Sequence, residues 1–277
     1  MTAAVGCFDG VHRGHRAILE GAEVAVTFRT HPLATLAPEK APWMIMSVEQ
    51  RLAAIHRCGV REVRLVDFDA TTAAMSPEDF VIKHLHGVSC VRCGEDWRFG
   101  RRGIGDARWL RDRGIETTVV AYAELDGKRV SSSRIRAAIA NGEIAAATAM
   151  LGHTLEMEGT VKRGKGEGRK LGFPTVNLFG EGEGRSLWTE LKRGVYAVEA
   201  GGRRALANFG MAPTFRDRSW QTPVLEVHFL DDCETPAFEE GRLLVVTLER
   251  FIRDERRFES VEALKRQIAA DKARCMI

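Results

Sequence analysis

Along the first half of the chain, the pattern of apolar and polar positions alternates between one typical of strands and one typical of helices. Short apolar runs bounded by turn residues predict buried strands. These runs lie at residues 3–5, 24–28, 62–68, 88–92 and 116–122. Between them, apolar positions spaced by three and four residues predict helices that begin near His15, Ser47, Ser76 and Ala107. Strands that alternate with helices in this way predict an α/β fold with a doubly wound parallel sheet.

The period of the pattern changes at about residue 152. Beyond it, short strands broken by glycines are expected at 155–162, 195–200, 203–208, 224–230 and 243–251, followed by a last helix at 260–272. This pattern is typical of an antiparallel β-barrel finished by one helix. The sequence therefore predicts two domains, 1–152 and 153–277, each long enough to bury a core.

Composition limits the classes of partner. A net charge of +3 is close to neutral for 277 residues, so we expect no nucleic-acid partner. The chain has no apolar run long enough to span a membrane and no secretory signal at its start, so we expect a cytoplasmic protein without a membrane partner. Cys90 and Cys93 form a single C-x-x-C pair, which we interpret as strand-end or core packing. No feature specifies an oligomeric state.

Candidate chemistry begins directly after the first predicted strand, in Gly6-Cys7-Phe8-Asp9-Gly10-Val11-His12-Arg13-Gly14-His15. Glycines permit a tight turn and a close approach of the backbone, and phosphates bind where a parallel strand turns into a helix. His12 and His15 are spaced to lie on one face of a first helical turn. Imidazoles placed there suit the stabilisation of charge on a transferred phosphoryl group. A helix-capping pair and part of a metal site are the alternatives.

Two further segments of the first half have the composition of ligand-binding loops. Residues 94–106 combine glycines with aromatic and basic side chains, among them Asp96 and Phe99. Residues 130–136 place Ser132 and Arg134 at a predicted helix N-terminus, where hydroxyl and guanidinium groups bind anions. An ordinary helix cap with exposed arginines is the alternative for this second segment.

In the second half, the basic and glycine-rich segment 162–170 precedes a segment that contains Thr175 and Asn177. Backbone N–H groups and cations in such a loop can hold phosphates, while neutral side-chain oxygens can hold Mg²⁺. Further along, the strand at 224–230 alternates so that Glu226 faces the same side as His228. A glutamate on the inner face of a strand can act as a general base, although a solvated loop and a surface glutamate are the alternatives.

The motifs of the first half resemble those of one enzyme family. H-x-G-H is similar to the nucleotidylyltransferase signature, and the longer string G-x-F-D-G-x-H-x-G-H resembles bacterial FAD synthetases. Residues 94–106 and 130–136 resemble that family's G-x-D-F-x-F-G and I-S-S-T-R-I-R strings. The resemblance implies catalytic roles for His12 and His15. It also implies flavin contacts for Asp96 and Phe99, and contacts with nucleotide phosphates for Gly6, Phe8, Asp9, Gly10, Ser132 and Arg134.

The second half resembles riboflavin kinases. Gly172-Phe173-Pro174-Thr175-Val176-Asn177 looks like their G-x-P-T-A-N segment, with valine in place of alanine, and residues 208–215 and the Glu226-Val227-His228 strand match two further segments. The resemblance implies that Thr175 and Asn177 hold nucleotide-bound Mg²⁺ and that Glu226 is the general base. Binding of ATP phosphates is then expected of Lys162, Gly168 and Arg169.

Together the motifs predict a bifunctional enzyme that phosphorylates riboflavin to FMN and adenylylates FMN to FAD, with ATP as co-substrate, Mg²⁺ as cofactor and pyrophosphate released. Two departures from the family pattern in the first half are not conservative: Cys7 stands where Asn is common, and the segment from His15 to Val24 is short. An alternative is therefore a riboflavin kinase whose N-terminal domain binds nucleotide but adenylylates weakly or acts on another phosphate. A third hypothesis is a flavin- or nucleotide-binding regulatory protein without turnover.

Overall fold

The computed structural model describes the whole chain except residues 165–167, 169–171, 181–185, 212–222, 231–237 and 276–277. Internal contacts divide the chain into two compact units, each of which is considered by itself. The sheet unit comprises Met1–Ile135 and Met150–Gly152, and the barrel unit comprises Arg136–Ala149 and His153–Ile277. This division differs from the predicted domains 1–152 and 153–277 over residues 136–149.

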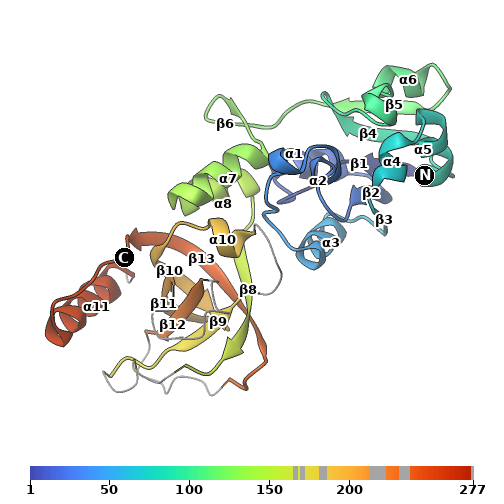
Figure 1. Cartoon of the computed structure of the whole chain (residues 1–277). Coiled ribbons are helices and arrows are strands. Elements are labelled where there is room, and N and C mark those ends of the chain that lie inside the picture. The colour runs from blue at the N-terminus through green and yellow to red at the C-terminus, as the bar shows by residue number, and fades with distance from the viewer. Residues whose placement is uncertain (165–167, 169–171, 181–185, 212–222, 231–237, 276–277) are drawn as a thin grey trace. The chain divides into compact units, whose positions relative to one another are not determined.

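A five-stranded parallel sheet forms the centre of the sheet unit (Figure 1). Its strands are β1 Thr2–Val5, β2 Val24–Phe28, β3 Glu62–Val66, β4 Cys90–Gly94 and β5 Glu116–Val120. They lie in the order β3-β2-β1-β4-β5, so that the order reverses between β1 and β4. In sheets of this kind ligands bind outside the carboxyl ends of the strands at the point of reversal.

Helices and short turns connect these strands. They are α1 Arg13–Leu19, α2 Leu33–Leu36, η1 Pro38–Lys40, α3 Val48–Arg57, α4 Ala70–Ala74, α5 Pro77–His84, η2 Arg101–Gly103 and α6 Ala107–Arg111. The hairpin β6 Glu124–Leu125 and β7 Lys128–Arg129 follows, and then α7 Ser132–Asn141 and α8 Ile144–Leu151. The capping box expected at Ser47 is confirmed, because its Oγ accepts from Gln50 N while the Gln50 side chain accepts from Ser47 N.

Successive residues of each strand pack on opposite faces of the sheet, as the period of two requires. Val5 packs in an apolar cluster with Leu110 of α6, whereas its neighbour Ala4 packs in a second cluster with Leu19 of α1 and Ile55 of α3. Helices therefore cover both faces, and the predicted doubly wound α/β fold is confirmed.

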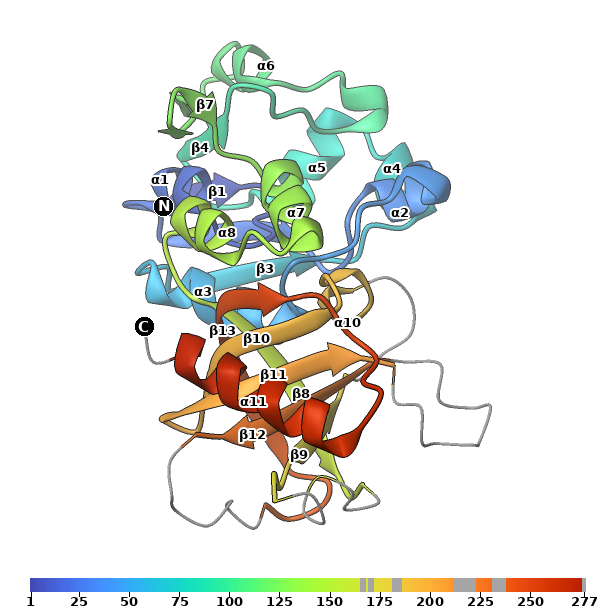
Figure 2. The same cartoon turned by 90° about the vertical axis from the view of Figure 1, so that its left-hand side faces the viewer.

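The barrel unit is a closed antiparallel barrel in the order β10-β11-β12-β9-β8-β13. Its strands are β8 Leu155–Lys162, β9 Val176–Phe179, β10 Gly194–Ala200, β11 Arg203–Gly210, β12 Val224–Phe229 and β13 Leu243–Arg253, with α10 Leu187–Glu190 between β9 and β10. The last helix, α11 Val261–Cys275, lies along the outside of the barrel (Figure 2). A buried ion pair of 2.8 Å between Arg253 and Asp271 fastens it to β13, which confirms the predicted barrel with a terminal helix.

The observed strands depart from the predicted ones at a few ends. The predicted strand at 88–92 begins instead at Cys90, because Val88 still belongs to the turn after α5 and donates its N–H to the Leu85 carbonyl. β9 was expected only as a motif, not as a strand. Among the residues that the structure describes, no helix is long and apolar enough to cross a membrane.

Candidate functional site

In the sheet unit, the segment that carries both histidines leaves the carboxyl end of β1 at the point of strand reversal. We call residues 6–15 the catalytic loop. The segment 94–106 begins at the end of the neighbouring strand β4. Two segments that the sequence marks as ligand loops therefore start side by side at the edge where α/β sheets bind ligands.

Residues in the middle of the catalytic loop adopt a left-handed backbone. Phe8 has φ 50°, Gly10 φ 80° and Val11 φ 37°. Such values suit glycine, but for a residue with a β-carbon they cost about 1–3 kcal/mol each and persist only where surrounding contacts enforce them. The loop must therefore be held by its neighbours.

Contacts from three other segments hold this backbone. The Cys7 carbonyl accepts from Thr27 Oγ1 at 3.0 Å and from Arg51 Nη1 at 3.1 Å. The buried Asp9 carboxylate accepts from the backbone N–H of Ile45 at 2.9 Å, and the Asp9 carbonyl accepts from Ser132 Oγ at 3.0 Å. Asp9 and Ser132, both expected to contact phosphates, are thus brought together by a contact that shapes the loop.

The two histidines lie against each other at the start of α1. His12 caps the helix, since its Nδ1 accepts from His15 N at 3.2 Å, so the capping interpretation holds for this side chain. The imidazole rings stack at 3.5 Å between centroids, and the Phe8 ring meets His15 edge-on at 5.5 Å. A Cβ at Gly14 would lie 3.3 Å from the His12 ring, a tight contact that glycine avoids. Because Nδ1 accepts, the neutral His12 ring carries its proton on Nε2.

In the segment 94–106 the two predicted flavin residues differ in surroundings. Asp96 Oδ2 accepts from Arg129 Nη2 at 2.8 Å, and the Arg129 guanidinium lies 3.4 Å from the centre of the Tyr122 ring. Phe99, by contrast, is 5% exposed and stacks on the half-buried Trp97 at 4.6 Å. Asp96 is thus at the surface, whereas Phe99 supports the loop from within.

The remaining predicted residues of the sheet unit contact backbone. Gly6 N donates to the Val26 carbonyl at 3.1 Å, which ties the start of the loop to β2. Arg134 Nη1 donates to the carbonyls of Lys128 and Arg129, so its guanidinium anchors the β6–β7 hairpin beside the N-terminus of α7.

In the barrel unit, a row of polar residues crosses four neighbouring strands. Strand register places Lys162 of β8 opposite Asn177 of β9, Asn177 opposite Glu226 of β12, and Glu226 opposite Asn208 of β11. Residues that pair directly across strands point to the same face. The backbone ladder therefore assembles the predicted base Glu226 and the predicted metal ligand Asn177 side by side.

Gly164, two residues after β8, lies against this polar row. A Cβ at Gly164 would fall 2.1 Å from Asn177 Nδ2, so any larger residue there would displace the Asn177 amide. Gly168 accepts from Phe173 N at 2.8 Å, and Thr175 is exposed just before β9. Arg169 lies outside the described residues. Asn177 Oδ1 is buried and makes no hydrogen bond within the part of the chain that the structure describes.

The surroundings of the polar row raise the pKa of Glu226. Burial raises the pKa of Glu226, and the charge of Glu255 raises it further. The Glu255 carboxylate lies directly over Gly210 of β11, where a Cβ would fall 1.8 Å from Oε1. Gly210 is two residues from Asn208 and so shares its face of the strand, which explains how Glu255 acts on Glu226 across β11 and β12.

Comparisons with known proteins find a family for each half of the chain. A family model described as FAD synthetase matches residues 1–134, and one described as riboflavin kinase matches residues 151–276. A bifunctional riboflavin kinase/FMN adenylyltransferase of Escherichia coli (strain K12) is 36% identical over 96% of this chain and 89% of its own length. The chain belongs to this family. A second bifunctional riboflavin kinase/FMN adenylyltransferase, from Bacillus subtilis (strain 168), is 31% identical over 97% of this chain and 89% of its own length.

A solved structure has a similar fold throughout. It is described as a macrolide-efflux protein from Streptococcus pneumoniae, and it matches with a TM-score of 0.85 and 28% identity over 98% of this chain and 92% of its own. This likeness spans both the FAD synthetase and the riboflavin kinase segments, so the two-unit architecture is shared along the full length.

Several residues of these sites lie outside the recognised motifs. Arg51 and Thr27 hold the catalytic loop, Arg129 binds Asp96, and Glu255 acts on Glu226. His228 belongs to the matched strand but has a structural contact, because its Nδ1 lies 2.9 Å from the Pro174 carbonyl and ties the segment before β9 to β12. Sequence periodicity gives no signal for such contacts, since each joins segments far apart in the chain.

Proposed function

We propose that the barrel unit transfers the γ-phosphate of ATP to riboflavin and that the sheet unit transfers the adenylyl group of a second ATP to the resulting FMN. The observation that carries the kinase part is the in-register row of Asn177, Glu226 and Asn208, since it juxtaposes a proton acceptor and a metal-binding oxygen. The observation that supports the adenylyl-transfer part is the stacked His12–His15 pair on a constrained loop at the reversal of the sheet.

In the kinase reaction Glu226 accepts the proton of the ribityl 5′-hydroxyl. The hydroxyl oxygen then bonds to the γ-phosphorus, the bond from that phosphorus to the bridging oxygen breaks, and ADP leaves. A pKa raised by burial and by Glu255 makes Glu226 a stronger base than an exposed glutamate once it is ionised. Lys162, Gly168 and Arg169 are the proposed contacts of the ATP phosphates.

The donors in the barrel fit a magnesium ion. Asn177 Oδ1 is a buried amide oxygen without a hydrogen bond among the described residues, and Thr175 precedes it at the surface. Neutral oxygens of this kind are ligands that Mg²⁺ accepts together with phosphate oxygens. Thr175 and Asn177 would hold Mg²⁺, which offsets negative charge on the nucleotide when bound.

In the adenylyl-transfer reaction an oxygen of the FMN phosphate bonds to the α-phosphorus of ATP, and pyrophosphate leaves. The attacking oxygen is already anionic, so no general base is required. His12 Nε2–H can donate to a phosphoryl oxygen, and His15 lies stacked beside it. The nucleotide site is then formed by backbone groups as much as by side chains. Its residues are Gly6, Phe8, Asp9, Gly10, Ser132 and Arg134.

Asp96 and Phe99 form the proposed flavin subsite. The Phe99 ring is covered, so it would act by supporting Trp97, whose stacked ring is half-buried. Asp96 and its partner Arg129 supply polar groups at the same loop.

A mass-resolved time course with riboflavin, ATP and Mg²⁺ tests both parts. We expect FMN to rise first and FAD to follow with release of pyrophosphate. His15→Ala removes a ring that is proposed to stabilise the transition state and should slow FAD formation about 100-fold while FMN formation is unchanged. FMN without FAD from the wild-type chain would favour the kinase-only alternative, and loss of both activities in His15→Ala would contradict the assignment of two separate sites.

A further inference from the structure

Arg51 of α3 is the only arginine among the fully buried residues of the described chain, with 0% of its surface exposed. Burial lowers the pKa of its guanidinium, while electrostatic interactions with Cys7, Asp9 and Glu49 act in the opposite direction. Arginine nevertheless stays protonated in proteins. A permanent charge at this depth is costly unless its N–H groups are hydrogen-bonded.

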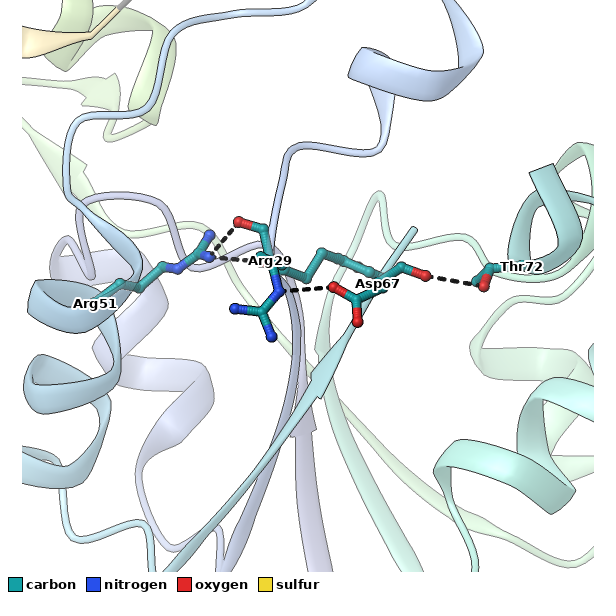
Figure 3. Close-up of polar contacts among 5 residues, drawn as sticks. Arg29, Arg51, Asp67 and Thr72 are labelled. Carbon is teal, nitrogen blue, oxygen red and sulfur yellow. Dashed lines mark hydrogen bonds and ion pairs between the residues drawn. The ribbon is translucent and has the colours of Figure 1, made fainter. Parts of the chain in front are cut away.

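The partners of Arg51 are backbone carbonyls at the carboxyl ends of two strands. Nη1 donates to the Cys7 carbonyl in the catalytic loop after β1. Nη2 donates to the carbonyls of Phe28 and Arg29 at the end of β2, at 2.5 and 3.0 Å (Figure 3). One planar guanidinium thus bridges the catalytic loop and the neighbouring strand end.

The β2 end is itself anchored further along the sheet. Arg29 Nε forms a 2.7 Å ion pair with Asp67 at the end of β3, and Thr72 Oγ1 of α4 donates to the Asp67 carbonyl (Figure 3). The carbonyls that face Arg51 therefore belong to a framework fixed by the sheet. In the catalytic loop, by contrast, the left-handed Phe8 directly follows the carbonyl that Arg51 holds, and the left-handed Val11 lies three residues further on.

We propose that Arg51 is a positioning residue for adenylyl transfer, which sets the place of His12 and His15 by holding the Cys7 carbonyl against the end of β2. This inference rests on the proposed function of the sheet unit. If the Arg51 contact were removed, the strained turn at residues 8–11 would relax. The N-terminus of α1, where His12 and His15 lie, would then move. A displacement of about 1 Å at reacting groups can cost about 100-fold in rate.

Arg51→Met and Arg51→Lys test the proposal, with Arg64→Met as the matched control. Arg64 is also a largely covered arginine of the sheet unit, and its Nη1 donates to the carbonyls of His84 and His86 away from the catalytic loop. We expect Arg51→Met to lower kcat for FAD formation from FMN about 100-fold, with KM for ATP changed less than about threefold. Lysine keeps the charge but not the planar fork, so Arg51→Lys should recover about tenfold of this loss.

Riboflavin phosphorylation by the barrel unit of the same chain should be unchanged in each variant. Arg64→Met should lower the unfolding temperature but leave kcat for FAD formation within about twofold. If Arg64→Met lowers kcat as much as Arg51→Met, or if a folded Arg51→Met keeps kcat within threefold, the proposal is wrong. Should Arg51→Met not fold, Arg51→Lys decides by the same criteria.

A readout independent of turnover separates this proposal from the proposed function. The ¹H and ¹⁵N resonances of the His12 and His15 imidazoles report ring position and the capping bond. They should shift in Arg51→Lys and stay in place in Arg64→Met. Unshifted resonances in a folded Arg51 variant would overturn the positioning role even if the wild-type chain adenylylates FMN, and shifted ones would support it even if another phosphate is the acceptor.

Discussion

The catalytic loop of the sheet unit and the polar row of the barrel differ in what fixes their geometry. In the barrel, Asn177, Glu226 and Asn208 stand on paired strands, and the backbone hydrogen bonds of the ladder place them side by side. In the sheet unit, the histidines follow a left-handed turn that depends on side-chain contacts with other segments, among them Thr27 and Arg51.

The difference predicts different sensitivities to mutation. A site built on strand register depends on the few side chains that contact the substrate, because the backbone that places them is fixed by the fold. A site built on a constrained loop depends in addition on residues that contact no substrate. Substitutions far from the reacting atoms should therefore lower activity more often in the sheet unit than in the barrel unit.

The largest effect is expected at Glu226. Glu226→Gln keeps the size of the side chain but cannot accept the hydroxyl proton, so kcat for FMN formation should fall about 1000-fold. Stability should not suffer, because burial and Glu255 already disfavour the charged form. The measurement is FMN formation from riboflavin, and FAD formation from supplied FMN is the internal control. Retention of more than a tenth of kinase activity would show that Glu226 is not the base.

A smaller, pH-dependent effect is expected from Glu255. As the proposed base, Glu226 must be ionised, so kinase activity should fall on acidification as Glu226 takes up a proton. The charge of Glu255 raises the pKa of Glu226, and Glu255→Gln removes that charge. The acid limb of the profile of kcat against pH should therefore move to lower pH, while the rates at pH 8 agree within about twofold.

The profile of FAD formation from FMN, measured on the same Glu255→Gln preparation, is the control and should not move. An acid limb that stays in place, or one that moves to higher pH, would mean that the charge of Glu255 does not raise the pKa of Glu226. Either result would also contradict the interpretation that Glu255, which lies over Gly210 of β11, adjusts the pKa of Glu226 on β12.

Much of the fold could be predicted from the pattern of the sequence. Segments with a single clear period were located closely: the strand at 24–28 and the strand at 155–162 have the observed bounds, and the capping box at Ser47 begins α3 as expected. The strand at Val176–Phe179 was missed, because its four residues are too few to display a period of two. The hairpin at 124–129 was missed for the same reason.

The sites divide in a similar way. The motifs indicate the histidines, Asn177 and Glu226 as candidate site residues, since these stand in continuous strings of unusual residues. Arg51, Arg129 and Glu255 could not be located, because each acts on a partner that is far away in the sequence and nothing in its own neighbourhood marks it. Long side chains that reach a distant backbone carbonyl obey no periodicity, and only the folded structure reveals them.

The smallest effect is expected at Arg92, which anchors the helix that carries His15. α1 has seven residues, and a helix of that length is not stable by itself. Arg92 of β4 donates from Nε to the Ile18 carbonyl at 3.0 Å and from Nη2 to the Ala17 carbonyl at 2.9 Å. These are carbonyls at the C-terminal end of α1, which lack partners within the helix and are stabilised by a nearby cation.

Arg92→Met should therefore destabilise the sheet unit by about 1–2 kcal/mol and speed hydrogen exchange in residues 13–19. It should lower kcat for FAD formation less than about threefold, because the strained turn remains held by Arg51 and only the far end of α1 is loosened. Arg108→Met, on an exposed arginine of α6, is the control and should change stability by less than about 0.5 kcal/mol. If exchange in α1 stays at the wild-type rate, the short helix is held by its apolar contacts with the sheet alone. If kcat falls as far as in Arg51→Met, the catalytic loop and α1 move as one body, and the sensitivity of the sheet unit extends further from the reacting atoms than the contacts of the loop imply.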